Sequence, residues 1–147
     1  MIAGLLILPF ILHIDMANLF TLSEASSIAL HGLVLIARSK DSLKVADIAE
    51  KIDSSKHHVA KVLQRLVKAG FLASHRGPGG GFHLKMAAEE INLLEIYETI
   101  EGKITISQCP LDKPICPFDK CILNNITGKM TSEFMDYLRS QNLKMFL

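Results

Sequence analysis

The sequence predicts a mainly α-helical fold, with the helix, helix, helix, hairpin order of a winged helix-turn-helix and a long C-terminal helix after it. Apolar residues recur at helical spacing through residues 22–69 and again near the C-terminus. Two short strand-like segments flank a tip rich in Gly and Pro. With 147 residues, 49% of them hydrophobic and 21% charged, the chain can bury a core and is not intrinsically disordered.

Three helices are predicted before the hairpin. They cover residues 22–38, 43–52 and 57–69. Thr21 and Glu24 have the spacing of a capping box at the start of the first helix. The turn Asp53-Ser54-Ser55 supplies the N-cap of the third helix, and Gly70 ends that helix where a left-handed residue is common.

A hairpin and two further helices complete the chain. The strands cover 71–75 and 81–84, and the helices cover 92–100 and 118–138. The strand connection, RGPGG, permits only a tight tip. Apolar residues follow one another at i+4 spacing along the last helix: Ile122, Ile126, Met130, Phe134 and Leu138. Gly128 lies inside this helix and weakens it by about 1 kcal/mol relative to Ala.

We expect three parts along the chain. Residues 1–15 are an extension upstream of a native start at Met16, residues 16–86 form the winged helix-turn-helix, and residues 87–147 hold a linker helix, a cysteine loop and the long last helix. The extension, MIAGLLILPFILHID, is too short to span a bilayer and lacks the basic region of a signal peptide. A short membrane-associating segment is the alternative. The prediction is a cytoplasmic protein with no membrane partner.

Charge is concentrated in the middle of the chain. Residues 38–85 carry a formal charge of +6, whereas residues 1–37 carry −2 and residues 86–147 carry −3. A basic module between acidic flanks is typical of a protein that meets a polyanion, although a solvated charged face explains the same numbers equally well. Charge therefore supports nucleic-acid binding without deciding it.

The order of elements favours duplex DNA as the partner, because the second helix of such a pair enters the major groove and the hairpin reaches the minor groove. Polar and basic side chains occupy the N-terminal turns of the third helix, and Arg76 sits on a hairpin tip whose glycines let the backbone approach closely. The predicted DNA-binding residues are Ser54, Ser55, Lys56, His57, His58, Lys61, Arg65, Arg76, Gly77 and Gly79. His57 and His58 are equally compatible with a purely solvent-facing role.

The chain resembles the Rrf2 family of bacterial transcription regulators. The resemblance rests on Leu63 to Phe71 (LQRLVKAGF), Arg76 to Phe82 (RGPGGGF) and Ile100-Glu101-Gly102, and it covers roughly residues 19–140. The family includes an iron–sulfur cluster regulator, a nitric-oxide-sensing repressor and a cysteine-metabolism repressor. The resemblance implies a homodimer on a double-stranded, pseudo-palindromic DNA operator, with the last helix as the dimer contact. The apolar stripe on the last helix would form this contact, although a stripe at this spacing is more often part of an ordinary core.

Three cysteines lie within 13 residues, at Cys109, Cys116 and Cys121. Thiols so close together in a chain with no secretion signal indicate metal or redox chemistry. Cluster-binding relatives carry three cysteines here, so the resemblance implies an iron–sulfur cluster, either 2Fe–2S or 4Fe–4S, on these ligands. Compared with the spacing common in those relatives, the middle cysteine is displaced by one residue. Ser27 and Asn124 occupy positions where some relatives supply a fourth ligand. Glu24 and His31 are the substitutes we consider, from the same or the partner's first helix.

Zinc, redox-active thiols and inert cysteines remain the alternatives at this site. The leading hypothesis for the whole chain is a DNA-binding transcriptional regulator that senses iron–sulfur, nitric oxide or redox status. A cluster-free regulator acting through a protein partner is the first alternative, and a small thiol-redox or electron-transfer protein is a remote one. No nucleophile–base pattern, phosphate loop or carboxylate pair is visible, so an enzyme is not predicted.

Overall fold

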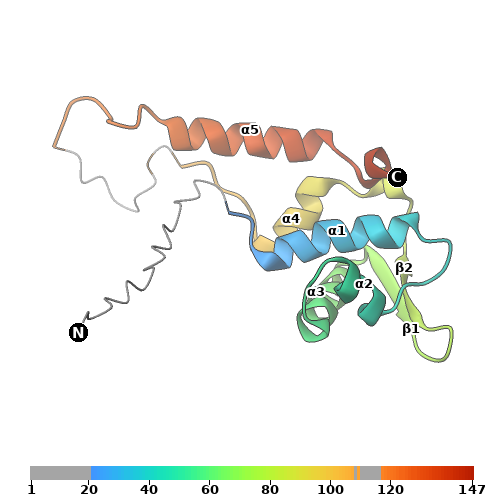
Figure 1. Cartoon of the computed structure of the whole chain (residues 1–147). Helices are drawn as coiled ribbons and strands as arrows, with labels where there is room; N and C mark the ends of the chain where they lie inside the picture. The colour runs from blue at the N-terminus through green and yellow to red at the C-terminus, as the bar shows by residue number, and fades with distance from the viewer. Residues whose placement is uncertain (1–20, 108, 110–116) are drawn as a thin grey trace, which may run out of the picture.

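The computed structural model describes residues 21–107, 109 and 117–147. Within these ranges the helices are α1 (Glu24–Arg38), α2 (Val45–Lys51), α3 (Lys56–Ala69), η1 (Ala88–Glu90), α4 (Leu93–Glu101), α5 (Ile126–Ser140) and η2 (Leu143–Phe146), and the strands are β1 (Leu72–His75) and β2 (Gly81–Leu84). The predicted extension 1–15 and Cys116 lie outside the described residues. The element order is the one expected of a winged helix-turn-helix with a further C-terminal helix (Figure 1).

The core forms where α1, α2 and α3 meet. Leu33, Ile48 and Leu63, one from each helix, are fully buried. Gly32 allows close packing here, because a Cβ added to it would stand 3.6 Å from a methyl of Leu63 and 3.8 Å from one of Ile48. Apolar burial of this kind is the main stabilising term for a helix trio. The core then continues under the hairpin through Phe82.

The caps of the first and third helices show how short polar residues set the helix starts. α1 begins at Glu24 rather than at residue 22, because Ser23 is its N-cap and its Oγ accepts a hydrogen bond from Ser26 N at 3.0 Å. The capping box predicted for Thr21 and Glu24 is therefore wrong. Ser55 is the N-cap of α3, as the predicted turn required, and accepts from His58 N at 3.2 Å.

The hairpin follows α3 directly. Gly70 ends α3 with φ 93°, the left-handed conformation that the sequence predicted. β1 and β2 pair antiparallel, with Leu72 opposite Leu84 and His75 opposite Gly81. A third segment joins them: Leu43 exchanges backbone hydrogen bonds with Phe82, at 3.0 and 2.8 Å. Leu43 therefore does not belong to the second helix, which begins only at Val45.

The start of helix α4 is held by a side chain. Asn92 is its N-cap and accepts from Leu94 N at 2.9 Å. The amide of Asn92 also donates to the backbone oxygens of Arg139 at 2.7 Å and Gln141 at 3.0 Å, which ties the start of α4 to the end of α5. α5 lies against α4 on the side of the molecule away from α3 and the hairpin (Figure 1). Near the C-terminal end of α5, Leu138 joins the central core, and Phe134 and Met135 pack against it.

The last helix is shorter than predicted. α5 begins at Ile126, because Asn124 and Asn125 adopt positive φ values of 46° and 56° and break the helical path. Ile122 consequently lies outside the helix and is 75% exposed, so the predicted stripe loses its first member. Gly128 is buried, and a Cβ there would stand 2.5 Å from Asn125 Oδ1 and 3.0 Å from the backbone oxygen of Ser107, so close packing favours glycine at this position. No helix in the described ranges combines the length and apolarity needed to cross a bilayer.

Candidate nucleic-acid interface and cysteine segment

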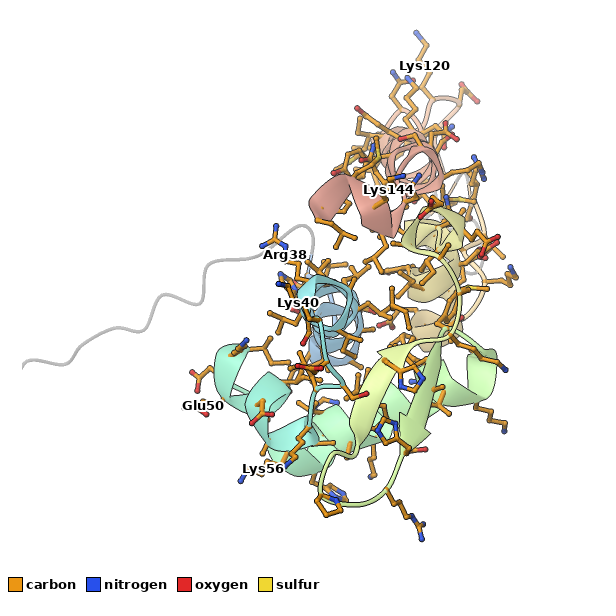
Figure 2. All side chains as sticks on the ribbon, turned by 90° about the vertical axis from the view of Figure 1, so that its right-hand side faces the viewer. Arg38, Lys40, Glu50, Lys56, Lys120 and Lys144 are labelled. Atoms are coloured by element: carbon orange, nitrogen blue, oxygen red, sulfur yellow. The ribbon has the colours of Figure 1, made fainter. Side chains whose placement is uncertain are left out.

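The recognition helix α3 is strongly two-sided. Its buried side consists of Val59, Val62, Leu63 and Leu66. His57, Lys61, Gln64 and Lys68 are exposed at helical spacing on the opposite side, and Lys56 is exposed at the first position of the helix. Figure 2 shows Lys56 extending outward at the end of the molecule where the hairpin tip also lies. This exposed line presents two cations and two groups able to read base edges on a helix whose other side is anchored in the core.

Three predicted contact residues at the start of α3 already have partners within the chain. Ser55 caps its own helix through the backbone N–H of His58. Ser54 Oγ donates to Glu24 Oε1 at 2.8 Å, and His58 Nδ1 lies 3.3 Å from Glu24 Oε2. The Ser54 hydroxyl, together with His58, holds the pKa of Glu24 below its usual value. The carboxylate of α1 thus stands at the N-terminus of the recognition helix.

Arg65 is placed differently from the other predicted cations. Its Nη2 donates to the backbone oxygens of Thr99 at 2.9 Å and Ile100 at 2.6 Å, both in the last turn of α4. A guanidinium that hydrogen-bonds the final carbonyls of a helix acts as a C-terminal cap. The structure therefore directs the Arg65 guanidinium to α4, although the residue is exposed like Lys56, His57 and Lys61.

The hairpin tip carries Arg76, which is fully in the solvent-exposed part of the wing. Gly77 has φ 114°, a conformation that side chains rarely adopt. A Cβ on Gly80 would stand 2.6 Å from the backbone oxygen of His75, so this glycine is required by close approach. His75 Nε2 lies 2.9 Å from the backbone oxygen of Gly79, which closes the tip from inside. The wing presents Arg76 on a tightly folded turn.

Sequence reasoning missed three structural features. It did not include Gln64, although Gln64 follows Lys61 by three residues and helical spacing places both on one side. It assigned Leu43 to a helix instead of to the hairpin. It treated Glu24 as a cap or ligand and did not connect it with Ser54, because nothing local in the sequence links residues 30 positions apart.

The cysteine segment is described only in part. Cys109 is half-buried and Cys121 is exposed. Backbone N–H groups of Asn125, Leu123 and Asn124 hydrogen-bond to the Cys121 sulfur and lower the pKa of its thiol. These N–H groups belong to the turn that precedes α5. Successive N–H groups that converge on one atom favour an anion there.

Both candidates for a fourth ligand have other contacts in the structure. Among the residues that the structure describes, no three His, Cys, Asp or Glu side chains come together. Glu24 is engaged with Ser54 and His58. His31 Nδ1 lies 2.8 Å from the backbone oxygen of Ser27, one turn earlier on α1. This contact orients the imidazole with Nε2 directed away from its own helix turn.

The three-helix core, the paired hairpin and the exposed basic face of α3 define a winged helix-turn-helix DNA-binding protein. Residues 22–147 match the Rrf2 family, described as iron-dependent transcriptional regulators. The chain belongs to the Rrf2 family of transcriptional regulators. Relatives with this function argue against an enzyme, as predicted.

Individual relatives agree with this assignment. The chain is 29% identical over 127 residues to the HTH-type transcriptional regulator NsrR of Bacillus licheniformis, spanning 84% of this chain and 89% of the relative. It is 26% identical over 110 residues to IscR of Vibrio vulnificus, spanning 75% and 66%. The fold matches that of CymR, the global cysteine regulator of B. subtilis, with a TM-score of 0.67, 21% identity and coverage of 85% and 94%. It also matches T. potens IscR, with a TM-score of 0.66, 20% identity and coverage of 85% and 84%.

Proposed function

We propose that this regulator acts as a homodimer in the cytoplasm, reads a double-stranded operator through α3 and the wing, and changes its DNA affinity with the state of the cysteine segment. That the chain is a DNA-binding transcriptional regulator follows from its family membership. The exposed basic line on α3 is the observation that carries the proposed mode of binding.

For DNA contact we propose two groups of residues. Lys56, Lys61 and Arg76 neutralise phosphates or enter the minor groove, and His57 faces the base edges. Ser54, Ser55 and His58 shape the start of α3 from within, while Gly77 and Gly79 let the wing backbone approach the duplex. We leave Arg65 out of the phosphate-binding set, because its contacts run to α4.

A second copy of the chain is the proposed partner of α5. Ile126 and Tyr137, three turns apart on this helix, are 47% and 55% exposed. Next to Tyr137 a groove of about 760 Å³ runs between α1 and the C-terminus, with Val34, Phe134 and Met145 in its lining. Exposed apolar surface beside an apolar groove fits a self-complementary interface. The two recognition helices of such a dimer would meet successive half-sites on one face of the duplex.

For the cysteine segment we propose an iron–sulfur cluster held by Cys109, Cys116 and Cys121. Three thiolates on one short segment are the donor set that such clusters use. The N–H groups that lower the pKa of Cys121 suit a coordinating thiolate, because hydrogen bonds to sulfur tune a bound cluster. When bound, the cluster would supply a group that reacts with oxidants or nitric oxide. Its type, 2Fe–2S or 4Fe–4S, stays open.

The fourth ligand is proposed to come from the first helix of the same chain or its partner. His31 suits this role better than Glu24, because its Nδ1 contact with Ser27 O leaves Nε2 oriented outward. The carboxylate of Glu24 is already used by two residues of the HTH unit. The candidate function without a cluster is a thiol-based regulator, and the exposed Cys121 thiol with its lowered pKa favours it specifically.

Anaerobic purification followed by a visible absorption spectrum and iron and sulfide analysis separates these possibilities. A cluster regulator shows iron–sulfur absorbance that disappears in Cys116→Ala, and the same substitution changes DNA affinity. Protein without iron whose DNA affinity still responds to thiol oxidants supports the cluster-free regulator. Iron-free protein whose DNA binding is the same before and after the substitution contradicts a sensing role for this segment.

A further inference from the structure

The carboxylate of Glu24 lies where the first turn of α1 meets the start of the recognition helix. It stands in the first turn of α1 and contacts two residues that open the recognition helix, Ser54 through Oε1 at 2.8 Å and His58 through Oε2 at 3.3 Å. The side chain of Glu24 remains 63% exposed and that of His58 34% exposed. The group therefore faces solvent beside the proposed DNA-binding surface and is not part of the core.

Its two partners are groups that a phosphate oxygen could use. Hydroxyl and imidazole donors beside a helix N-terminus form a favourable environment for an anion. In this structure the anion at that point is supplied by the chain itself: Ser54 donates to it, and His58 Nδ1 lies 3.3 Å from it. A DNA phosphate that approaches the start of α3 meets a negative charge, a hydroxyl that is already engaged and an imidazole in contact with that charge.

We propose that Glu24 is a positioning residue that raises the specificity of DNA binding by acting through Ser54 and His58. This inference rests on the proposed function, in which the N-terminal turns of α3 face the duplex. Two effects of Glu24 point in the same direction, one on binding without sequence preference and one on base reading.

The first effect concerns binding without sequence preference. Such binding comes almost entirely from phosphate contacts, so an additional negative charge at the interface weakens it. Lys56 and Lys61 belong to the helix whose first turn Glu24 contacts, so they gain less from a random duplex while Glu24 is charged. Replacing Glu24 by Gln removes the charge and keeps an oxygen that can accept from Ser54.

The second effect concerns base reading. Hydrogen bonds to base edges require side chains held in defined directions, whereas phosphate contacts tolerate variation. The contacts of Glu24 fix the N-terminal turn of α3 against α1, which keeps His57 and Lys61 oriented as a set. Loss of these contacts lowers affinity for a preferred sequence without lowering affinity for a random one.

The ratio of two affinities tests the proposal. The probes are a random-sequence duplex of about 30 base pairs, long enough for half-sites about 34–36 Å apart, and a duplex of equal length selected from that pool by the wild-type protein. Both affinities are measured at one fixed salt concentration for wild type, Glu24→Gln and Ser54→Ala. Glu95→Gln is the matched control, because it removes one exposed acidic charge from α4 and Glu95 has no side-chain contact with α3 among those described.

We expect Glu24→Gln to bind the random duplex about three- to fivefold more tightly and the selected duplex no more tightly than wild type, so that the specificity ratio falls about three- to tenfold. Ser54→Ala lowers the ratio in the same direction, and Glu95→Gln leaves it unchanged. A ratio in Glu24→Gln equal to that of wild type overturns the inference. Thermal unfolding of each variant ensures that folded protein is compared, since loss of stability alone lowers both affinities together. Wild-type protein that binds neither duplex contradicts the proposed function itself.

Discussion

Arg65, in the middle of the recognition helix, donates from Nη2 to the backbone oxygen of Ile100 at 2.6 Å, in the last turn of α4. The same nitrogen reaches Thr99 O at 2.9 Å. One residue further on, the carboxylate of Glu101 accepts hydrogen bonds from the hydroxyls of Ser23 and Ser26 on α1. The point where α4 ends and the segment leading to the cysteines begins is therefore fastened to both α1 and α3.

This junction leads to the first prediction. Arg65→Ala should lower the free energy of unfolding by about 1–2 kcal/mol, because two charge-assisted hydrogen bonds to helix carbonyls are lost. Chemical denaturation measures the change. Since Arg65 contacts α4, the salt dependence of DNA binding should stay as in wild type, whereas Lys61→Ala, the matched control, should make it shallower. An unchanged stability together with a shallower salt dependence in Arg65→Ala would return this residue to the DNA-binding set.

The second prediction concerns the wing. Arg76→Ala should weaken binding to the selected duplex by about tenfold, and more than Lys85→Ala, because only Arg76 sits on the tip between the two strands. A minor-groove Arg also senses groove width, so its loss should reduce the preference for narrow A·T-rich flanks. Mobility-shift titrations on duplexes with A·T-rich and G·C-rich flanks measure both effects. Equal losses in the two variants would argue against a wing that contacts DNA.

The third prediction concerns α5. Ile126→Lys combined with Tyr137→Lys should convert the dimer into monomers, because two exposed apolar side chains on one side of the helix become charged. Tight binding to a duplex with two half-sites should also be lost, because a monomer no longer has the second DNA-binding domain tethered to it. Sedimentation velocity gives the oligomeric state. Asp136→Lys with Ser140→Lys, at exposed polar positions of the same helix, should remain dimeric. A dimeric Ile126/Tyr137 variant would move the interface elsewhere.

The fourth prediction concerns the thiol of Cys121. Its pKa is lowered by the N–H groups of Asn125, Leu123 and Asn124, so the thiolate forms at lower pH in the folded protein than in the unfolded chain. The stabilisation from this group is therefore present above the unfolded pKa, about 8.5, and is lost as the pH falls through the folded value. Metal-free protein with Cys109 and Cys116 replaced by Ser allows this single thiol to be followed.

The rate of alkylation by iodoacetamide, measured against pH, should have a midpoint below that of the same protein in guanidinium chloride. Folded and unfolded midpoints that coincide would show that the turn before α5 does not stabilise the thiolate.

The winged helix-turn-helix was largely predictable because its sequence signals are local. Helical spacing identified α1, α2 and α3, and Gly70 marked the end of α3 correctly. The start of α1 was wrong because Thr21 and Ser23 are both good caps, and only packing decides between them. The last helix was predicted too long because its i+4 pattern continues through Ile122, while the backbone turns at Asn124 and Asn125. Asn adopts positive φ more readily than most residues, but the sequence does not show when it does.

Long-range contacts could not be predicted from periodicity. Arg65 looked like a phosphate-binding cation because it lies on a basic helix, yet its partners are more than 30 residues away in α4. Glu24 likewise contacts Ser54, which lies 30 residues away in the sequence. In both cases the side chain is long and charged, and its partner depends on how α1, α3 and α4 cross. The contact set of such residues follows from tertiary packing and not from local pattern.

The central claim is that the N-terminal part of α3 and the wing form the DNA-binding face. The dependence of DNA affinity on salt concentration tests it, in wild type, in Lys56→Ala/Lys61→Ala/Arg76→Ala, and in Lys120→Ala/Lys129→Ala/Lys144→Ala as a matched control. Figure 2 shows Lys120 and Lys144 at the opposite end of the molecule from Lys56. We predict that log affinity falls linearly with log salt and that the first triple variant reduces the slope by about 0.9 for each lost phosphate contact, while the control keeps the wild-type slope. A flat dependence in wild type, or an equal reduction in both triple variants, would contradict it.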